Sequence, residues 1–228
     1  MFDELVLVQK LLASVVVGYL LGAVPSGLLV GKLFRGIDIR EYGSGKIGTA
    51  NALRTLGWKG SALVFVLDLL KGAIPVSFAY FLTSSDLAAV ISAAAAMVGH
   101  NWSVFIGFQG GRGVVTAFGA FLVLSPLAAI FSLVVGLSVI ALSRYVSLGS
   151  MVGAVASAGS SLFMLQIGRG SYLVFVLMVF VAALIIFQHR DNLVRLCRGT
   201  ERKLGQPAER RAPSPSSAGV RQRQGVRE

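Results

Sequence analysis

Two glycine-rich stretches hold most of the residues that could do chemistry in this chain. The first reads GSGKIGTANALRTLG, and its candidate phosphate-binding residues are Gly43, Ser44, Gly45, Lys46, Thr49, Asn51 and Arg54. Glycine lets successive backbone N–H groups point into one concavity, and hydroxyl and guanidinium groups add further donors for an anion. The P-loop spacing is absent. A flexible basic connector explains the same composition equally well.

The second stretch repeats this chemistry around one arginine. It reads GHNWSVFIGFQGGRGVVT, in which Gly110, Gly111 and Gly113 surround Arg112. The residues after Gly113 are predicted to begin a helix, and a helix N-terminus behind a glycine-rich turn favours phosphate. The alternative is a tight interhelical turn with one cation that sets membrane topology.

Histidines occur at two positions only. His189 and Asn192 are three residues apart, so we expect them to share one helical face and to take part in catalysis; the alternative is an interfacial histidine without a function. His100 is expected to be structural and to bond a backbone carbonyl. Two histidines without paired carboxylates do not indicate a metal site, and the single Cys197 excludes an internal disulfide.

The polar residues as a group are donors and cations, without a Ser–His–Asp arrangement or a pair of carboxylates. This inventory suits a reaction whose difficulty is anionic charge, with catalysis by positioning and electrostatic stabilisation. We therefore expect phosphate-containing substrates, at least one with a lipid tail held between helices. A transporter of an organic phosphate is the alternative, although the inverted repeats typical of transporters are not visible.

Long apolar runs must position these residues. The chain of 228 residues is 55% apolar with a mean hydropathy of +0.76, and a spanning helix needs about 20 mostly apolar residues. The apolar runs cover 11–31, 60–82, 87–108, 113–142, 146–166 and 171–187. The sequence therefore predicts an all-α polytopic membrane protein. Its net charge of +11 indicates topology and contact with anionic membrane lipids, not nucleic acid.

The distribution of lysine and arginine predicts the number of passes. The loop 32–59 and the segment from 189 onward are both basic, so both are expected in the cytoplasm, with an even number of passes between them. This parity requires the run 113–142 to form two passes that meet at Ser125-Pro126, because proline disfavours helix at the preceding residue. We therefore expect a bundle of seven transmembrane helices with the N-terminus outside and the C-terminus cytoplasmic.

Two further features concern the interior and the tail. Asp68 and Lys71 lie within an apolar run with a spacing that allows them to pair. Two roles are open: the two residues form a structural pair, or Asp68 orients a basic site residue such as Arg54 or Arg112. We expect residues 1–203 to form the membrane domain and residues 204–228, which are basic and poor in large apolar side chains, to form a disordered cytoplasmic tail.

Four motifs occur in an order that resembles one known family. They read GSG…G..NALRTLG, LDLLKG, GHNWSVF…F.GGRGV.T and HRDNLVRL..GTERK, and the similarity runs from about residue 18 to 203. The chain resembles the bacterial acyl-phosphate-dependent glycerol-3-phosphate acyltransferases, the PlsY family. The resemblance implies acyl transfer from acyl phosphate to the 1-hydroxyl of glycerol-3-phosphate, giving lysophosphatidic acid and phosphate without a cofactor. It also implies seven helices in the inner membrane and a cytoplasmic-facing site.

The resemblance further implies roles for individual residues. Ser44, Arg54 and Arg112 match positions that hold phosphate groups, and His189 and Asn192 match a pair that places glycerol-3-phosphate. Arg112 stands where the family usually has lysine. Because no protein base is evident, the resemblance suggests that a substrate phosphate oxygen takes the hydroxyl proton.

Overall fold

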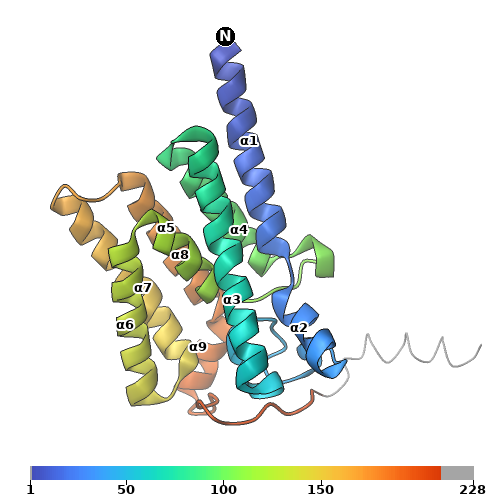
Figure 1. Cartoon of the computed structure of the whole chain (residues 1–228). Coiled ribbons are helices and arrows are strands. Elements are labelled where there is room, and N and C mark those ends of the chain that lie inside the picture. Colours follow the sequence, from blue (N-terminus) through green and yellow to red (C-terminus); the bar gives the residue numbers. More distant parts are fainter. Residues whose placement is uncertain (1, 212–228) are drawn as a thin grey trace, which may run out of the picture.

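Helices make up the regular structure of this protein. The computed structural model describes residues 2–211 (Figure 1). In chain order its helices are α1 Phe2–Ala23, α2 Ser26–Arg35, η1 Ile39–Glu41, α3 Thr49–Thr83, α4 Asp86–Asn101, η2 Val104–Ile106, α5 Val114–Leu124, α6 Pro126–Ser143, α7 Val146–Gln166, α8 Tyr172–Gln188 and α9 Arg190–Cys197.

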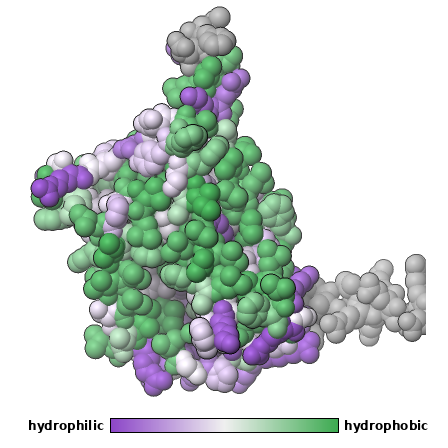
Figure 2. Space-filling view, in the orientation of Figure 1, coloured by the Kyte–Doolittle hydropathy of each residue, from purple (hydrophilic) through white to green (hydrophobic). Residues whose placement is uncertain are grey.

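The long helices have the length and composition of membrane spans, which confirms the predicted fold class. Five helical segments in the described part of the chain are long and apolar enough to cross a membrane, and α8 with α9 makes a sixth if the bent pair counts as one span. The shorter α5 is also apolar. Figure 2 shows apolar side chains over the flank of the bundle and hydrophilic ones along its lower edge. The number of crossings and their orientation stay predictions.

Proline and glycine set the breaks in these helices. The predicted break at Ser125-Pro126 is confirmed, because α5 ends at Leu124 and α6 begins with proline, whose missing N–H is tolerated at the first helical position. The first apolar run differs from expectation, because it breaks before Ser26 at Pro25. Helix α3 also differs: it begins at Thr49, well before the predicted span, and continues past a non-helical residue, Gly57, with φ of 79°.

Asp68 and Lys71, whose spacing allows them to pair, form an ion pair inside the bundle. Lys71 Nζ lies 2.8 Å from Asp68 Oδ1, and both side chains are almost fully buried. The same ammonium group donates to Val24 O at 2.9 Å and contacts Ser26 Oγ at 3.4 Å. The pair therefore fastens α3 to the break between α1 and α2, where Val24 O also accepts a hydrogen bond from Ser26 N at 3.0 Å.

Small residues bring the helices of the core close together. Gly18 and Gly22 of α1 face Ser92 and Ala96 of α4, and a Cβ atom at either glycine would meet their backbone oxygens. In the same way, Gly72 of α3 lies against the backbone of α5. Close packing of this kind is one source of helix association in a bilayer, where lipid chains are as apolar as the helices and the hydrophobic effect does not drive association.

We predict that Gly72→Ala destabilises the protein. The added methyl group would collide with the carbonyl oxygen of Thr116, and overpacking of this kind typically costs about 1–3 kcal/mol. The measurement is the thermal unfolding midpoint in detergent micelles. Gly159→Ala is the control, because Gly159 lies on α7 with no atom near the added Cβ. An equal midpoint for the two variants would contradict the close contact between α3 and α5.

Candidate active site

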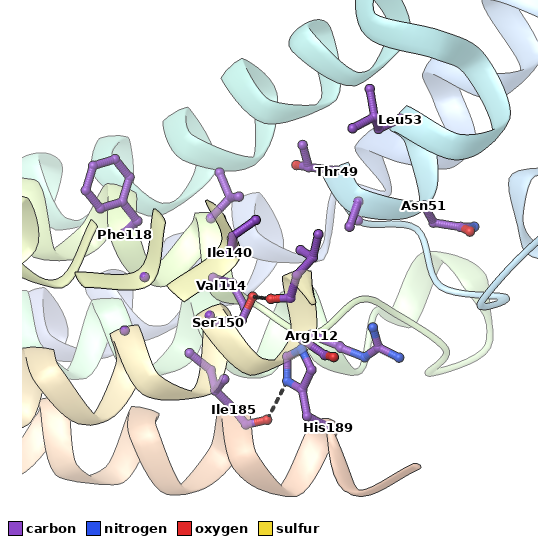
Figure 3. A pocket seen from close by; sticks show the side chains of 18 of the residues that line it. Thr49, Asn51, Leu53, Arg112, Val114, Phe118, Ile140, Ser150, Ile185 and His189 are labelled. Atoms are coloured by element: carbon purple, nitrogen blue, oxygen red, sulfur yellow. Dashed lines mark hydrogen bonds between the residues drawn. The ribbon is translucent and has the colours of Figure 1, made fainter. Parts of the chain in front are cut away.

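One cavity of about 750 Å³ collects side chains from all three polar segments that the sequence singled out. Figure 3 shows part of its lining. The cationic residues come from different segments: Lys46 from the loop before α3, Arg54 from α3, and Arg112 from the turn before α5. Ser44, Thr49, His189 and Asn192 add polar groups to the same lining. The expected convergence of the three segments on one space is therefore found.

Away from the cations most of the cavity lining is apolar, and Figure 3 shows Phe118 at the end far from Arg112 and Asn51. This apolar lining is formed by side chains of α5, α6 and α7, among them Phe118, Phe121, Leu133, Leu137 and Ile140. A long hydrocarbon chain fits such a surface, because its transfer from water to an apolar wall is favourable. The cavity thus offers a cationic end and a lipid-like end within one space.

The backbone of the glycine loop is not open to an anion in this structure, which corrects the role predicted for Gly43 and Gly45. Gly43 N donates to Glu209 O at 3.0 Å, and Gly45 N donates to Tyr42 O at 3.0 Å. Neither glycine lines the cavity. Both have positive φ, 55° and 71°, so they shape a tight loop that presents side chains, and not amides, to the cavity.

The Asn51 side chain holds this loop against the start of α3. Its Oδ1 accepts a hydrogen bond from Ser44 N at 3.0 Å. Its Nδ2 contacts three loop carbonyl oxygens at 3.1, 3.2 and 2.8 Å, those of Ile39, Tyr42 and Lys46. Because these contacts use both ends of the amide, Asn51 organises the loop and has little capacity left for the phosphate contact that we predicted.

Lys46 and Thr49 keep polar groups free for a ligand. Thr49 Oγ1 is buried and has no hydrogen-bond partner within residues 2–211. Burial lowers the pKa of Lys46, and the nearby charge of Arg112 lowers it further. Two cations that repel each other across one cavity indicate that an anion between them would be strongly favoured.

The two guanidinium groups lie at the same end of the cavity. Arg54 Nη2 donates to Arg202 O at 3.4 Å, which ties α3 to the segment after α9. Arg112 Nε is buried without a hydrogen-bond partner in the described part of the chain. Burial lowers the pKa of Arg112 to about 10, and the charge of Arg195 adds to this effect. Arg112 therefore stays protonated at neutral pH and has an unused donor for a phosphate oxygen.

The turn before α5 packs against the end of α4. Gly111 N donates to His100 O at 3.1 Å, and a Cβ atom at Gly110 or Gly111 would collide with His100. Neither glycine lines the cavity, so their predicted contacts with phosphate stay a prediction without support from the lining. Gly113 does line it and precedes α5 with φ of 80°. The first two glycines are needed for close packing that aims Arg112 into the cavity.

His100 is a packing residue, but its partner differs from the one expected. Its Nδ1 lies 3.3 Å from Thr116 Oγ1 and 3.9 Å from Asp68 Oδ1, whereas we expected a backbone carbonyl. His100 and Asp68 both line the cavity. These contacts favour a structural role for the Asp68–Lys71 pair. Asp68 also lies near His100, and His100 packs against the glycine turn.

His189 presents an unprotonated nitrogen to the cavity. It lies at the bend between α8 and α9, and its Nδ1 donates to Ile185 O at 2.8 Å (Figure 3). A carbonyl oxygen only accepts, so Nδ1 carries the hydrogen and Nε2 keeps its lone pair. Burial lowers the pKa of His189 to about 4, and the charge of Arg112 contributes. His189 is therefore neutral at pH 7 and can accept a hydrogen bond from a hydroxyl group.

Glu201 is the residue that the sequence analysis missed. Its carboxylate accepts hydrogen bonds from Ser147 Oγ at 2.8 Å, Asn192 Nδ2 at 2.6 Å and Arg195 Nε at 2.7 Å. Burial raises the pKa of Glu201, but these three donors outweigh it and hold the pKa below its usual value. Glu201 thus joins α7 to α9 and fixes Asn192, whose Oδ1 is buried without a partner in residues 2–211. The sequence did hold one signal for Glu201, because it is an acid flanked by cations in the basic segment after the last span.

The arrangement suits the binding of anions and offers little for a metal ion. Among residues 2–211, no group of three or more His, Cys, Asp or Glu side chains lies together as a metal site would require. Donors and cations converge instead from three turns. The site can hold phosphate groups at one end and a hydrocarbon chain at the other.

Comparisons with known proteins agree with this geometry. A family model described as glycerol-3-phosphate acyltransferase matches residues 12–199. A glycerol-3-phosphate acyltransferase of Thermus thermophilus is 47% identical over 199 residues, which cover 87% of this chain and 97% of the relative. One of a Thermoanaerobacter species is 42% identical over 196 residues, with coverage of 86% and 96%.

Solved structures give the same result. A crystal structure of PlsY (YgiH), an integral membrane glycerol 3-phosphate acyltransferase, in its glycerol 3-phosphate form superposes with a TM-score of 0.79. It is 38% identical and covers 86% of this chain and 96% of its own. The lysophosphatidic acid form of that protein has a TM-score of 0.77 at the same identity, with coverage of 86% and 95%. The chain therefore belongs to the glycerol-3-phosphate acyltransferase family, together with the integral membrane protein PlsY.

Proposed function

We propose that this protein transfers a fatty acyl group from acyl phosphate to the 1-hydroxyl of glycerol-3-phosphate. The products are lysophosphatidic acid and inorganic phosphate, and the reaction supplies phospholipid synthesis. The observation that carries the proposal is the shape of the cavity, in which Lys46, Arg54 and Arg112 meet at one end of a space with apolar walls. Both substrates carry phosphate, and only one carries a hydrocarbon chain. Membership of the glycerol-3-phosphate acyltransferase family also supports glycerol-3-phosphate as the acceptor.

The lining residues divide between the two reactants by their chemistry. The acyl chain lies along the apolar side chains of α5, α6 and α7, and the phosphate groups lie against the two guanidinium groups, with Ser44 and Thr49 as further donors. His189 Nε2 accepts the hydrogen bond of the glycerol hydroxyl, and Asn192 holds the acceptor beside it. These contacts would place the hydroxyl oxygen close to the acyl carbonyl carbon, which is the main requirement for attack.

The reaction needs no nucleophile or cofactor from the protein. The hydroxyl oxygen attacks the acyl carbonyl, the new ester bond forms, and the bond to phosphate breaks; the mixed anhydride supplies a good leaving group. The proton passes to a substrate phosphate oxygen. This acceptor is a better base than His189, because a phosphate monoester has a second pKa of about 6 whereas burial lowers the pKa of His189 to about 4.

We further propose that the site faces the cytoplasm from a bacterial inner membrane. Seven apolar segments, with the N-terminus outside, would place the loop before α3 and the segment after α8 on the same side. Both are rich in lysine and arginine, which favours the cytoplasmic side. In Figure 1 these two regions lie together at the end of the bundle opposite the N-terminus.

The donor can be tested with the purified protein in liposomes. Palmitoyl phosphate with labelled glycerol-3-phosphate should give labelled lysophosphatidic acid in the lipid extract, and palmitoyl-CoA should give none. Accumulation of unchanged label inside the vesicles would indicate a transporter instead. Product formed from palmitoyl-CoA at an equal rate would contradict the proposed donor.

We predict that Arg54→Ala and Arg112→Ala each lower kcat at least ~100-fold. A loss of this size is usual when a site loses one preorganised donor that stabilises charge developing in the transition state. Arg112→Lys keeps the charge but loses the bidentate fork, so it should retain part of the activity. The measurement is the initial rate of acyl transfer. Arg198→Gln serves as the control, since Arg198 is exposed after α9 and does not line the cavity. Wild-type rates in both alanine variants would remove the site assignment.

The pH dependence distinguishes the substrate phosphate from His189 as the base. Activity should fall as the pH drops through about 6, because protonation of a phosphate oxygen removes the acceptor for the hydroxyl proton. The residual activity of His189→Gln should show the same fall, at a lower maximum rate. Loss of this acid limb in His189→Gln would identify His189 as the base.

A further inference from the structure

Residues 204–211 lie beyond the family match, which ends at residue 199, and run across the cationic end of the cavity. In Figure 1 this segment passes beneath the bundle from α9 toward the loop before α3. We expected disorder from residue 204 onward. The structure places 204–211 in contact with three other parts of the chain, and residues 212–228 lie outside the described residues. We call 204–211 the strap.

The strap pairs with the loop before α3 through its backbone. Tyr42 and Arg210 form an antiparallel bridge, in which Arg211 N donates to Glu41 O at 2.7 Å and Gly43 N donates to Glu209 O at 3.0 Å. These bonds occupy the same loop that Asn51 holds from the other side. The loop is therefore held between α3 and the strap.

Side chains strengthen this pairing. Arg210 Nη2 lies 3.0 Å from Glu41 Oε2, and Arg211 Nη1 donates to Ser44 O at 3.4 Å. A Cβ atom at Gly45 would collide with the Arg211 guanidinium group, so this group lies directly on the loop. The charge of Arg211 also makes a small contribution to the lowered pKa of Lys46, which lines the cavity.

The beginning of the strap forms part of the cavity wall. Its first four residues line the cavity, and they are Leu204, Gly205, Gln206 and Pro207. Leu204 N donates at 2.7 Å to the carbonyl oxygen of Arg144, the residue that follows α6. Ala208 N donates at 3.4 Å to the carbonyl oxygen of Arg54 on α3. The strap therefore bridges two sides of the cationic end and contacts the backbone of one of its arginines.

We propose that the strap is a positioning element that holds the 41–46 loop in the conformation that binds glycerol-3-phosphate. This inference rests on the proposed function. Glycerol-3-phosphate is water-soluble and reaches the site from the aqueous side that the strap borders, whereas the acyl donor brings its chain between the helices. Loss of the strap contacts therefore weakens binding of the acceptor and leaves binding of the donor unchanged. The effect is on KM, because the contacts are equal in the ground state and the transition state.

The test uses substitutions at Arg211 in the full-length protein. Arg211→Pro removes both the amide donor to Glu41 O and the guanidinium group, Arg211→Ala removes only the latter, and Arg211→Lys keeps the amide and the charge. We expect the KM for glycerol-3-phosphate to rise about three- to tenfold in Arg211→Pro and less in Arg211→Ala. Arg211→Lys should stay near the wild-type value. The kcat and the KM for palmitoyl phosphate should change less than about twofold.

Arg198→Ala controls for loss of one positive charge outside the cavity, and its KM should match that of the wild type. The proposal is overturned if Arg211→Pro leaves the KM for glycerol-3-phosphate unchanged, lowers it, or raises only the KM for palmitoyl phosphate. It is also overturned if Arg198→Ala raises KM as much as Arg211→Ala does. A wild-type protein without acyl transfer would refute the proposed function; binding of glycerol-3-phosphate to the Arg211 variants, measured by calorimetry, would then still test the strap.

Discussion

Positive charge that the protein itself neutralises only in part is the feature on which the site depends. Two carboxylates line the cavity in the described part of the chain, and both are already engaged. Asp68 pairs with Lys71, and Glu201 accepts its hydrogen bonds from α7 and α9, so neither bonds the guanidinium groups of Arg54 and Arg112. The charge of Glu201 offsets the lowering of the pKa of Arg112 only in part. Cations gathered in a partly buried space are costly without an anion. A phosphorylated ligand supplies that anion, and the favourable free energy of its interaction with the cations is available for binding and catalysis.

The cations keep their positions because two polar side chains hydrogen-bond to the surrounding segments and hold them together. Asn51 binds the loop before α3 through both ends of its amide, and Glu201 joins α7 to α9. Both side chains are buried, so their hydrogen bonds are little weakened by water. Neither has to touch a substrate. Each fixes the position of residues that do, such as Ser44 and Asn192, and the strap adds a second support to the same loop.

A continuous set of contacts links the membrane interior to the arginine turn. Lys71 fastens Asp68 to the break after α1, Asp68 lies near His100, and His100 packs against the glycine turn that carries Arg112. Glycines are required here because the turn approaches the imidazole too closely for a Cβ atom. The geometry of the site is therefore set partly by residues that lie deep in the bundle, where ion pairs are stronger than at the surface.

The sequence by itself determined the all-α membrane bundle and the break at Ser125-Pro126, and it left the pairing of Asp68 with Lys71 as one of two possible roles. The bundle follows from long apolar runs, the break from the count of basic loops together with the missing amide of proline, and the possible pair from an i, i+3 separation. The sequence also located the polar segments that converge. Only the tertiary structure decided which donors are free and which are used. The amide of Gly43 is taken by a residue far away in the chain, Glu209, and contacts between distant segments depend on how the helices pack, which no local pattern encodes.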